Sequence, residues 1–194
     1  PRVQAEKCYE VCVKHGKPVI VMEPVRGGSL VNLPEAGLDE IAKLGEYSPA
    51  GYAIRYAASF DNIFMVLSGM SNMEQMNDNI KSMKDFTPFT ETEFDTVYRV
   101  ADIIRAIPTI PCTSCKYCTD GDRCPMSIRI HSIFGAENKA RRFNTEDARG
   151  QYNWVTSKGG KPTDCIECGA CEEICPQQLP IRQLLKEIGE RFEG

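Results

Sequence analysis

The sequence predicts an α/β region followed by an all-α region, and three observations support this division. Two short runs, residues 18–22 and 63–67, are apolar at every position, as expected of parallel strands that are covered on both faces. Helical periodicity precedes, separates and follows these runs, so the expected order is helix, strand, helix, strand, helix. Beyond residue 110 few runs alternate in the manner of strands, and helices are expected there instead.

The first two helices are marked by their ends. The first stops before Gly16, a residue suited to a left-handed C-cap. Its apolar stripe is Ala5, Cys8, Val11 and Cys12. The two cysteines of this stripe are expected to be packed in a core, where cysteine is often found. Ser48 caps the second helix, and Pro49 occupies its first turn. Its predicted stripe is Ala50, Ala53, Ala57 and Phe60.

Two capping boxes open the next helices, Ser71-x-x-Glu74 and Thr90-x-x-Glu93. The helix after Ser71 is expected to bury Met73, Met76, Ile80 and Met83. The helix after Thr90 is expected to bury Phe94, Val97, Ala101 and Ile104. It runs to Pro108 and Pro111, and this pair of prolines predicts a domain boundary.

The alternating region is too small to be a complete sheet domain. Two parallel strands cannot cover their own faces, and an eight-stranded barrel takes about 250 residues. Residues 1–86 are therefore predicted to be the C-terminal part of a (β/α)8 TIM barrel, with residues 87–110 as a connecting helix. The expectation is a piece of a longer protein, or a homo-oligomer in which another copy completes the barrel sheet.

Eight of the ten cysteines fall into two runs after residue 110. The first run has the spacing C-x2-C-x2-C-x5-C-P and the second C-x2-C-x2-C-x3-C-P. A C-x2-C-x2-C loop can aim three thiolates at three corners of a cubic iron-sulfur cluster, and the cysteine before proline then ligates the cluster of the other run. The predicted ligand sets are Cys112, Cys115, Cys118 and Cys175 for one [4Fe-4S] cluster, and Cys165, Cys168, Cys171 and Cys124 for the other.

Three alternatives to clusters fit the spacing less well. Disulfides are typical of small secreted domains, and no signal peptide opens the sequence given. Zinc is usually held by separated C-x2-C pairs, which would leave the third cysteine of each run unexplained. Unligated core cysteines would not need this spacing. The five-residue gap before Cys124 leaves one alternative open: if Cys124 cannot reach, one cluster has three irons instead of four.

Residues 111–194 are predicted to form a helical, ferredoxin-like domain around the two clusters. Helices are expected over Ile128–Phe143 and near Trp154. The last helix carries the stripe Ile181, Leu184, Leu185 and Ile188.

The loops that follow the two strands are suited to phosphate binding. Ser68-Gly69-Met70 leads from a strand into a capped helix, so free backbone N–H groups and the helix dipole meet there. Gly27 and Gly28 follow the other strand and would let the backbone approach a ligand closely. Together the two loops favour a nucleotide site at the carboxyl ends of adjacent strands.

Three stretches of the sequence resemble a known family. Residues 19–33, with IVMEPVRGGSLVNL, and residues 53–80, with LSGMSNMEQMNDNI, resemble the last two strands and helices of an aldo/keto reductase barrel. Residues 164–188, DCIECGACEEICPQQLPIRQLLKEI, resemble the two-cluster extension of a bacterial branch of that family. The resemblance implies an NAD(P)(H)-dependent carbonyl reductase as the complete protein.

The resemblance also implies which residues contact the nucleotide. Those along the pyrophosphate would be Val25 and Arg26, those around the adenosine phosphate Gly69, Met70, Ser71 and Asn72, and those toward the adenine Gln75 and Asn79. Ser71 stands where many relatives have a basic residue for the 2′-phosphate, and Met22 where many have an aromatic residue against the nicotinamide. No catalytic residue is predicted, because the family's Tyr, Asp, Lys and His come from early strands that are not in this sequence.

The expected function is that of an iron-sulfur oxidoreductase whose clusters exchange electrons with a redox partner protein. Nicotinamide transfers two electrons and each cluster one, so a flavin is expected elsewhere or in the partner. The alternatives are clusters that serve folding alone, or a stand-alone ferredoxin-like carrier. Basic residues do not exceed acidic ones in either part, 11 against 15 in residues 1–110 and 12 against 12 after them, so no nucleic acid is expected. Short apolar runs predict no membrane span, and a cytoplasmic location is expected.

Overall fold

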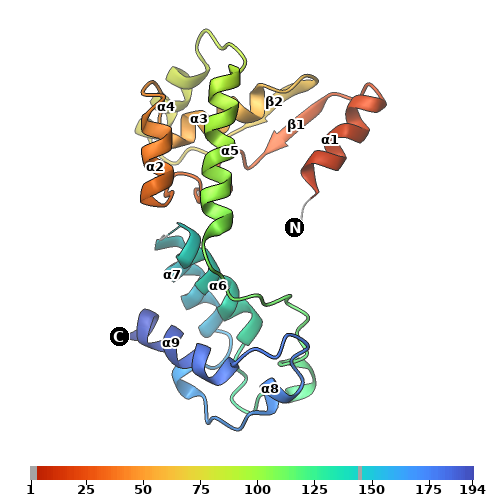
Figure 1. The fold of residues 1–194 in the computed structure, drawn as a ribbon, viewed down its shortest axis with the longest axis vertical. Coiled ribbons are helices and arrows are strands. Elements are labelled where there is room, and N and C mark those ends of the chain that lie inside the picture. The colour runs from red at the N-terminus through yellow and green to blue at the C-terminus, as the bar shows by residue number, and fades with distance from the viewer. Residues whose placement is uncertain (1–3, 144–145) are drawn as a thin grey trace. The chain divides into compact units, whose positions relative to one another are not determined.

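The computed structural model describes residues 4–143 and 146–194, and the chain divides into two compact units. The first unit is Pro1–Ala106 and the second is Ile107–Gly194. Figure 1 shows an α/β unit with a short sheet and a unit built of helices and loops. None of the described helices is long and apolar enough to cross a membrane.

The first unit has the predicted alternation of helices and strands. Its elements are α1 (Ala5–Lys14), β1 (Val19–Met22), α2 (Glu35–Ala42), α3 (Pro49–Ala58), β2 (Ile63–Leu67), α4 (Met73–Met83) and α5 (Glu91–Ala106). The two strands pair in parallel, with Met22 opposite Leu67. The prediction of two neighbouring parallel strands is therefore confirmed. The sequence pattern gave no prediction of α2.

Several predicted helix ends are also confirmed. Gly16 has a φ of 58°, in the left-handed region that a C-cap requires. The Ser48 hydroxyl accepts a hydrogen bond from the Gly51 N–H at 2.9 Å. Thr90 and Glu93 form a capping box, in which the Thr90 N–H donates to the Glu93 carboxylate at 2.7 Å.

The predicted cap of α4 is wrong by one residue. The N-cap is Asn72, whose side-chain oxygen accepts a hydrogen bond from the Gln75 N–H at 2.9 Å. Asparagine is at least as good a cap as serine, so the shift follows from ordinary cap preferences. The Ser71 N–H instead donates to the Gln75 side chain at 2.7 Å.

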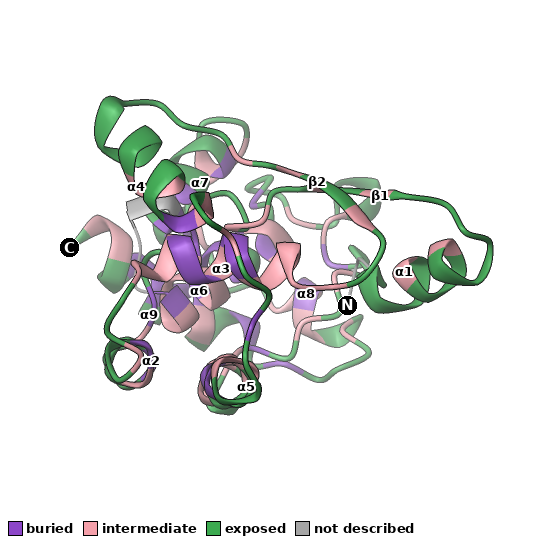
Figure 2. Cartoon of the chain, turned by 90° about the horizontal axis from the view of Figure 1, so that it is seen from above, coloured by how far each residue is buried: buried purple, intermediate pink, exposed green. Residues whose placement is uncertain are grey.

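The predicted burial of the first unit is wrong in several places, as Figure 2 shows by the green of α1 and α4. Both strands expose apolar side chains, including Met22 at 74% and Phe64 at 70%. The residues that were expected in a core but are exposed are Cys8, Met73, Met76 and Ile80. Among the described residues no third strand extends the sheet, so the apolar sides of the strands and of α1 and α4 lack the neighbouring strands on which they would pack.

The core of the first unit lies between α2, α3 and α5. Tyr52, Ile41 and Val100 are buried there, and Phe94, Val97 and Ile104 of the predicted α5 stripe pack against them. On α3 the fully buried positions are Gly51, Tyr52, Ile54 and Arg55, and the predicted stripe around Ala53 is only half-buried. The reason is that α3 packs its Gly51 side against Ser82 of α4, so close that a Cβ on Gly51 would overlap the serine.

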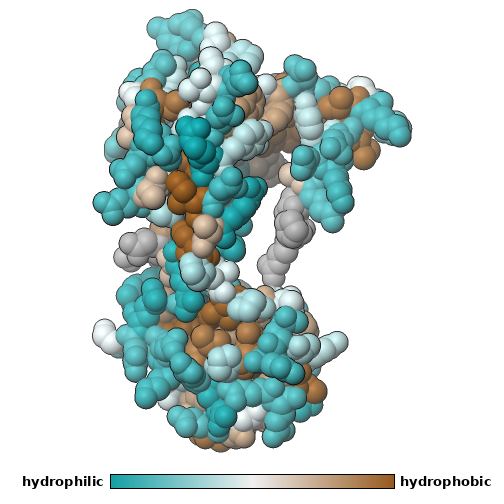
Figure 3. Space-filling view, in the orientation of Figure 1, coloured by the Kyte–Doolittle hydropathy of each residue, from teal (hydrophilic) through white to brown (hydrophobic). Residues whose placement is uncertain are grey.

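The second unit is built of helices around two cysteine-lined loops. Its elements are η1 (Asp120–Asp122), α6 (Ile130–Phe143), α7 (Glu146–Thr156), η2 (Pro162–Asp164), α8 (Ala170–Glu173) and α9 (Ile181–Glu193). The predicted helices from Ile128, near Trp154 and from Ile181 are confirmed. Hydrophobic residues gather in the middle of this unit in Figure 3, ringed by hydrophilic ones.

The core of the second unit contains cysteines as well as aliphatic residues. Ile133 and Phe134 of α6 and Leu185 and Ile188 of α9 are at most 1% exposed. Cys118 and Cys171 belong to the same core, and Cys112, Cys124, Cys165 and Cys175 pack against it. The site and the core of this unit are therefore one structure.

Candidate metal centres and nucleotide loops

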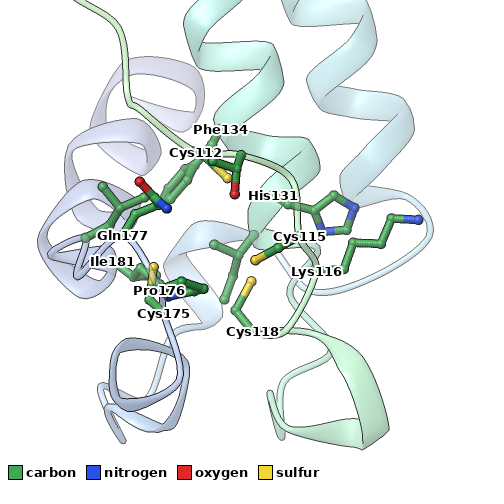
Figure 4. A pocket seen from close by; sticks show the side chains of 13 residues that line it. Cys112, Cys115, Lys116, Cys118, His131, Phe134, Cys175, Pro176, Gln177 and Ile181 are labelled. Carbon is green, nitrogen blue, oxygen red and sulfur yellow. The ribbon is translucent and has the colours of Figure 1, made fainter. Parts of the chain in front are cut away.

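Four cysteines from both runs surround a first cavity. Cys112, Cys115 and Cys118 line it together with Cys175, and Ile130, Phe134 and Ile181 close its apolar wall. In Figure 4, Cys115 and Cys118 lie on one side of the cavity and Cys175 reaches toward it from the other. The thiol groups are thus spread around a space instead of meeting at one point.

The other four cysteines surround a second cavity. Cys165, Cys168 and Cys171 line it together with Cys124, and its apolar wall includes Ile128, Ile130 and Leu185. Each cavity therefore takes three cysteines from one run and the last from the other run. These are the two groups of four that the sequence predicts as ligand sets.

The five-residue gap does not keep Cys124 away from the second cavity. The gap folds into η1 (Asp120–Asp122), in which Gly121 and Asp122 have φ values of 61° and 55°. This tight turn takes up the two residues by which the first run is longer. Gly160 then packs against the loop after Cys124 so closely that a Cβ there would overlap the Met126 carbonyl oxygen.

The two cysteine runs have the same backbone conformation at matching positions. Ser114 and Lys116 have φ values of 58° and 71°, and the matching Glu167 and Gly169 have 57° and 80°. Left-handed residues next to right-handed ones turn successive N–H groups toward one side, which makes the concave anion sites found at many iron-sulfur clusters. Both loops are therefore suited to holding a negatively charged, thiolate-ligated cluster.

The match continues through the segment after each proline. Ser127 and Gln178 have φ values of 52° and 49°, and each donates its N–H to the carbonyl of the cysteine three residues before it. Ile130 and Ile181 then begin α6 and α9. The pattern C-P-x-x-(I/L)-x-I, read as CPMSIRI and CPQQLPI, is the sequence signal that could have identified these cavity-lining aliphatic residues.

Side-chain contacts fix both loops to the helices behind them. The Ile110 N–H donates to Asn138 Oδ1 at 2.7 Å, and Asn138 Nδ2 donates back to the Ile110 carbonyl at 2.8 Å, which anchors the chain just before Cys112. On the other loop, Glu172 accepts from the N–H of Arg182 at 2.8 Å and from its guanidinium at 2.9 Å. The Arg182 guanidinium holds the pKa of Glu172 below its usual value.

Burial acts on the third cysteine of each run. Cys118 and Cys171 are each 8% exposed, and burial raises the pKa of both thiols to about 11. Iron binds the thiolate, so loading these sites must release protons.

No three His, Cys, Asp or Glu side chains of residues 4–143 and 146–194 converge on a single metal ion. Four thiols around one cavity suit the separate corners of a cluster, and the residues present therefore fit two [4Fe-4S] groups.

Six of the eight predicted nucleotide residues lie in the two loops that follow β1 and β2, and the remaining two, Gln75 and Asn79, lie on α4. Both loops leave the same end of the sheet, because Met22 and Leu67 are paired at the ends of the two strands. In the first loop Arg26, Gly27 and Gly28 have φ values of 52°, 60° and 85°, and Val25 is half-buried. In the second loop Gly69, Met70, Ser71 and Asn72 are exposed.

Gln75 and Asn79, expected toward the adenine, hold the second loop in this structure. Gln75 accepts from the Ser71 N–H, and Asn79 Nδ2 donates to Ser68 Oγ at 2.9 Å. A role in contacting nucleotide remains a prediction for all eight residues. The structure gives Gln75 and Asn79 the further role of positioning the loop between β2 and α4.

The chain combines an α/β unit, with two loops at one end of its sheet, and a helical unit with two sets of four cysteines that suit iron-sulfur clusters. A sequence model of the aldo/keto reductase family matches residues 1–102, which is more than half of the chain, and the chain belongs to this family. A model described as a 4Fe-4S dicluster domain matches residues 111–179. Among curated proteins none matches the chain. The recognition of this combination from the sequence is confirmed.

Proposed function

We propose that this protein is an iron-sulfur oxidoreductase in which a nicotinamide-dependent aldo/keto reductase barrel is coupled to two electron-transferring [4Fe-4S] clusters. The observation that carries the proposal is the pair of cavities, each lined by four cysteines from both runs. When bound, each cluster would accept and release one electron at a time. Residues 1–86 would form the end of the barrel, residues 87–110 the connection and residues 111–194 the cluster domain.

The chain's own residues would hold and shield the clusters. The cysteines would supply four thiolates to each site, while Ile130, which lines both cavities, would keep water from the space between them. Left-handed residues such as Lys116 and Gly169 would turn backbone N–H groups toward the sulfurs. Hydrogen bonds to sulfur and exclusion of solvent are the factors by which a protein sets the potential of a cluster.

The first unit would bind NAD(P)(H) along the edge where its two loops meet. Arg26 would supply positive charge to the pyrophosphate, and the N–H groups at the start of α4 would face the adenosine phosphate. Ser71 carries no positive charge to bind a 2′-phosphate, so NAD fits this loop better than NADP. Carbonyl reduction itself would need the family's Tyr, Asp, Lys and His, which this sequence does not supply.

A second function has one observation in its favour. Because the cysteines are part of the hydrophobic core of the second unit, clusters could serve to fold that unit without exchanging electrons. The two functions differ in whether the clusters change oxidation state at potentials that a biological donor reaches.

Anaerobic reconstitution followed by iron and sulfide analysis tests both. We expect about eight irons per chain and, after reduction, the electron paramagnetic resonance signals of two interacting four-iron clusters. Zinc, or no metal, would overturn the cluster assignment. If eight irons are present but dithionite does not reduce the clusters, the role in folding is supported and electron transfer is excluded.

A further inference from the structure

A third cavity of the second unit is basic and borders both cysteine sites. Lys116, Arg129 and Lys158 line it, and Asp122 is the one carboxylate among its lining residues in the described chain. Lys116 also lines the first cysteine cavity, and Cys124 lines both this cavity and the second one. Below, this space is called the basic cavity.

The cations of the basic cavity have no carboxylate ion-pair partner within the described part of the chain. No described carboxylate lies within ion-pair distance of Lys116, Arg129 or Lys158. A neighbouring open cavity offers a contrast, because its lining mixes Glu167 and Glu190 with cations, and its Arg182 is paired with Glu172 at 2.9 Å. The excess of positive charge therefore distinguishes the basic cavity from this neighbouring one.

Exposed aromatic residues adjoin these cations. Trp154 is 57% exposed, and the Lys158 ammonium lies 4.1 Å from the centre of its ring. Tyr117 is 52% exposed and directly follows Lys116. Tryptophan, tyrosine and arginine are the residues most enriched at the energetic centres of protein interfaces. Their presence beside the cations favours a protein surface as the ligand over a small anion.

We propose that the basic cavity, with Tyr117 and Trp154 at its side, is the docking site for an acidic one-electron carrier protein. The inference rests on the proposed function, in which Lys116 and Cys124 bring the cavity to the wall of each cluster site. One electron would pass between a cluster and the carrier, so that one is oxidised as the other is reduced. The polypeptide has a net formal charge of −4, and the cations gathered at this cavity would steer an acidic carrier toward it.

Two small outer-sphere oxidants of opposite charge test the site without a known partner. The reduced, reconstituted chain is mixed in a stopped-flow apparatus with tris(oxalato)cobaltate(III), an anion, or with hexaamminecobalt(III), a cation, and the second-order rate constants are compared. Each oxidant takes one electron. A variant that combines Lys116→Gln, Arg129→Gln and Lys158→Gln should lower the ratio of the anionic to the cationic rate constant about tenfold at low ionic strength, because steering by charge changes such rates by about 10 to 1,000 times.

The ratio separates charge steering from other effects. A change in cluster potential would affect both oxidants in the same direction and leave the ratio nearly unchanged. The decrease should fade toward about 1 M salt, where the screening length falls to about 3 Å. A control variant with Lys7→Gln, Lys14→Gln and Lys84→Gln removes the same charge from exposed positions of the first unit. An equal decrease in both variants, or none in either, overturns the proposal.

Binding can also be measured without electron transfer. A fluorophore-labelled octaglutamate peptide should show a rise in anisotropy with the reconstituted chain, and Trp154→Leu should weaken this binding severalfold. Tighter binding of a labelled oligo(dT) of the same length would assign the surface to nucleic acid and overturn the proposal.

The reconstituted samples must contain about eight irons. A low iron content of the unsubstituted chain would refute the proposed function, whereas full iron with an unchanged rate ratio would refute the docking site alone. If the triple variant fails to take up iron, the Arg129→Gln, Lys158→Gln double variant, which leaves the cysteine loops unaltered, should still lower the ratio.

Discussion

Glu137→Gln is expected to destabilise the second unit, because it removes the charge of a buried carboxylate that contacts two arginines. Glu137 is 1% exposed on α6. One carboxylate oxygen accepts a hydrogen bond from Arg141 Nε at 2.7 Å, and the other lies 3.2 Å from Arg191 Nε of α9. The contact with Arg191 is an ion pair without hydrogen-bond geometry. The substitution preserves shape and removes the charge that both guanidinium groups face.

The expected loss is about 2 kcal/mol. A hydrogen bond to a charged group contributes about 1.5–3 kcal/mol and a neutral one about 0.5–1.5, so the Arg141 contact should lose about 1–1.5 kcal/mol. Arg191 is 53% exposed, and solvent screening limits its contribution to less than about 1 kcal/mol. With a urea dependence of about 1–2 kcal/mol per molar, the unfolding midpoint should fall by about 1–2 M.

Fluorescence can follow this transition because Trp154 is the sole tryptophan and lies on α7, which packs against α6. The reconstituted chain is unfolded in urea under anaerobic conditions, and visible absorbance of the clusters is recorded in parallel. Glu190→Gln, on the exposed side of α9, is the matched control and should leave the midpoint within about 0.3 M. A midpoint for Glu137→Gln equal to that of the control would refute the reasoning, since it would mean that desolvation cancels the attraction.

Three further outcomes follow from the site and its supports. Cys175→Ala and Cys124→Ala should each remove at least one iron from the reconstituted chain. The electron paramagnetic resonance spectra of the two variants should differ, because each cysteine borders a different cavity. Identical spectra would contradict the assignment of each last cysteine to the cluster of the other run. Gly160→Ala should speed iron loss, because its Cβ would overlap a backbone carbonyl of the facing loop. The control is Gly135→Ala, whose Cβ would meet nothing nearer than 3.7 Å and which should stabilise α6 by about 0.5–1 kcal/mol. Equal rates of iron release from the two variants would show that the close approach of Gly160 is unimportant. Asn72→Ala should weaken α4 by about 1 kcal/mol, seen as faster hydrogen exchange in its first turn, and unchanged exchange would exclude the cap.

The cysteine spacing was informative because it encodes local geometry. A C-x2-C-x2-C loop turns within a few residues, so the positions of its three thiols depend little on the rest of the fold. The fourth thiol is different, since Cys124 and Cys175 reach their cavities across the unit. Spacing alone could not decide whether Cys124 reaches the second cavity across the five-residue gap. Its position depends on the left-handed residues Gly121 and Asp122 and on the close packing of Gly160 against the loop that follows it.

Apolar periodicity predicted the helices of the first unit but not their burial. The stripe of Met73, Met76 and Ile80 has the pattern of a core face, yet all three side chains are exposed. Periodicity reports which residues share a face and does not report whether a neighbour covers it. On the face of α4 that is used instead, Asp78 accepts a hydrogen bond from Ser48, the N-cap of α3, and Ser82 packs against Gly51. Polar residues give no such signal in a hydrophobic pattern.

The crossed arrangement of cysteines couples the two sites to each other and to the core. Neither run alone lines a cavity with four thiols, so closing either set brings both runs together. The aliphatic wall is shared as well, since Ile130 borders both cavities and begins α6. Loss of one cluster would therefore leave an apolar wall and a buried thiol, Cys118 or Cys171, without a partner in the same core that supports the other cluster. A unit that exchanges electrons through these sites would therefore also depend on them for its structure, whereas dependence of the structure on the clusters does not by itself imply electron transfer.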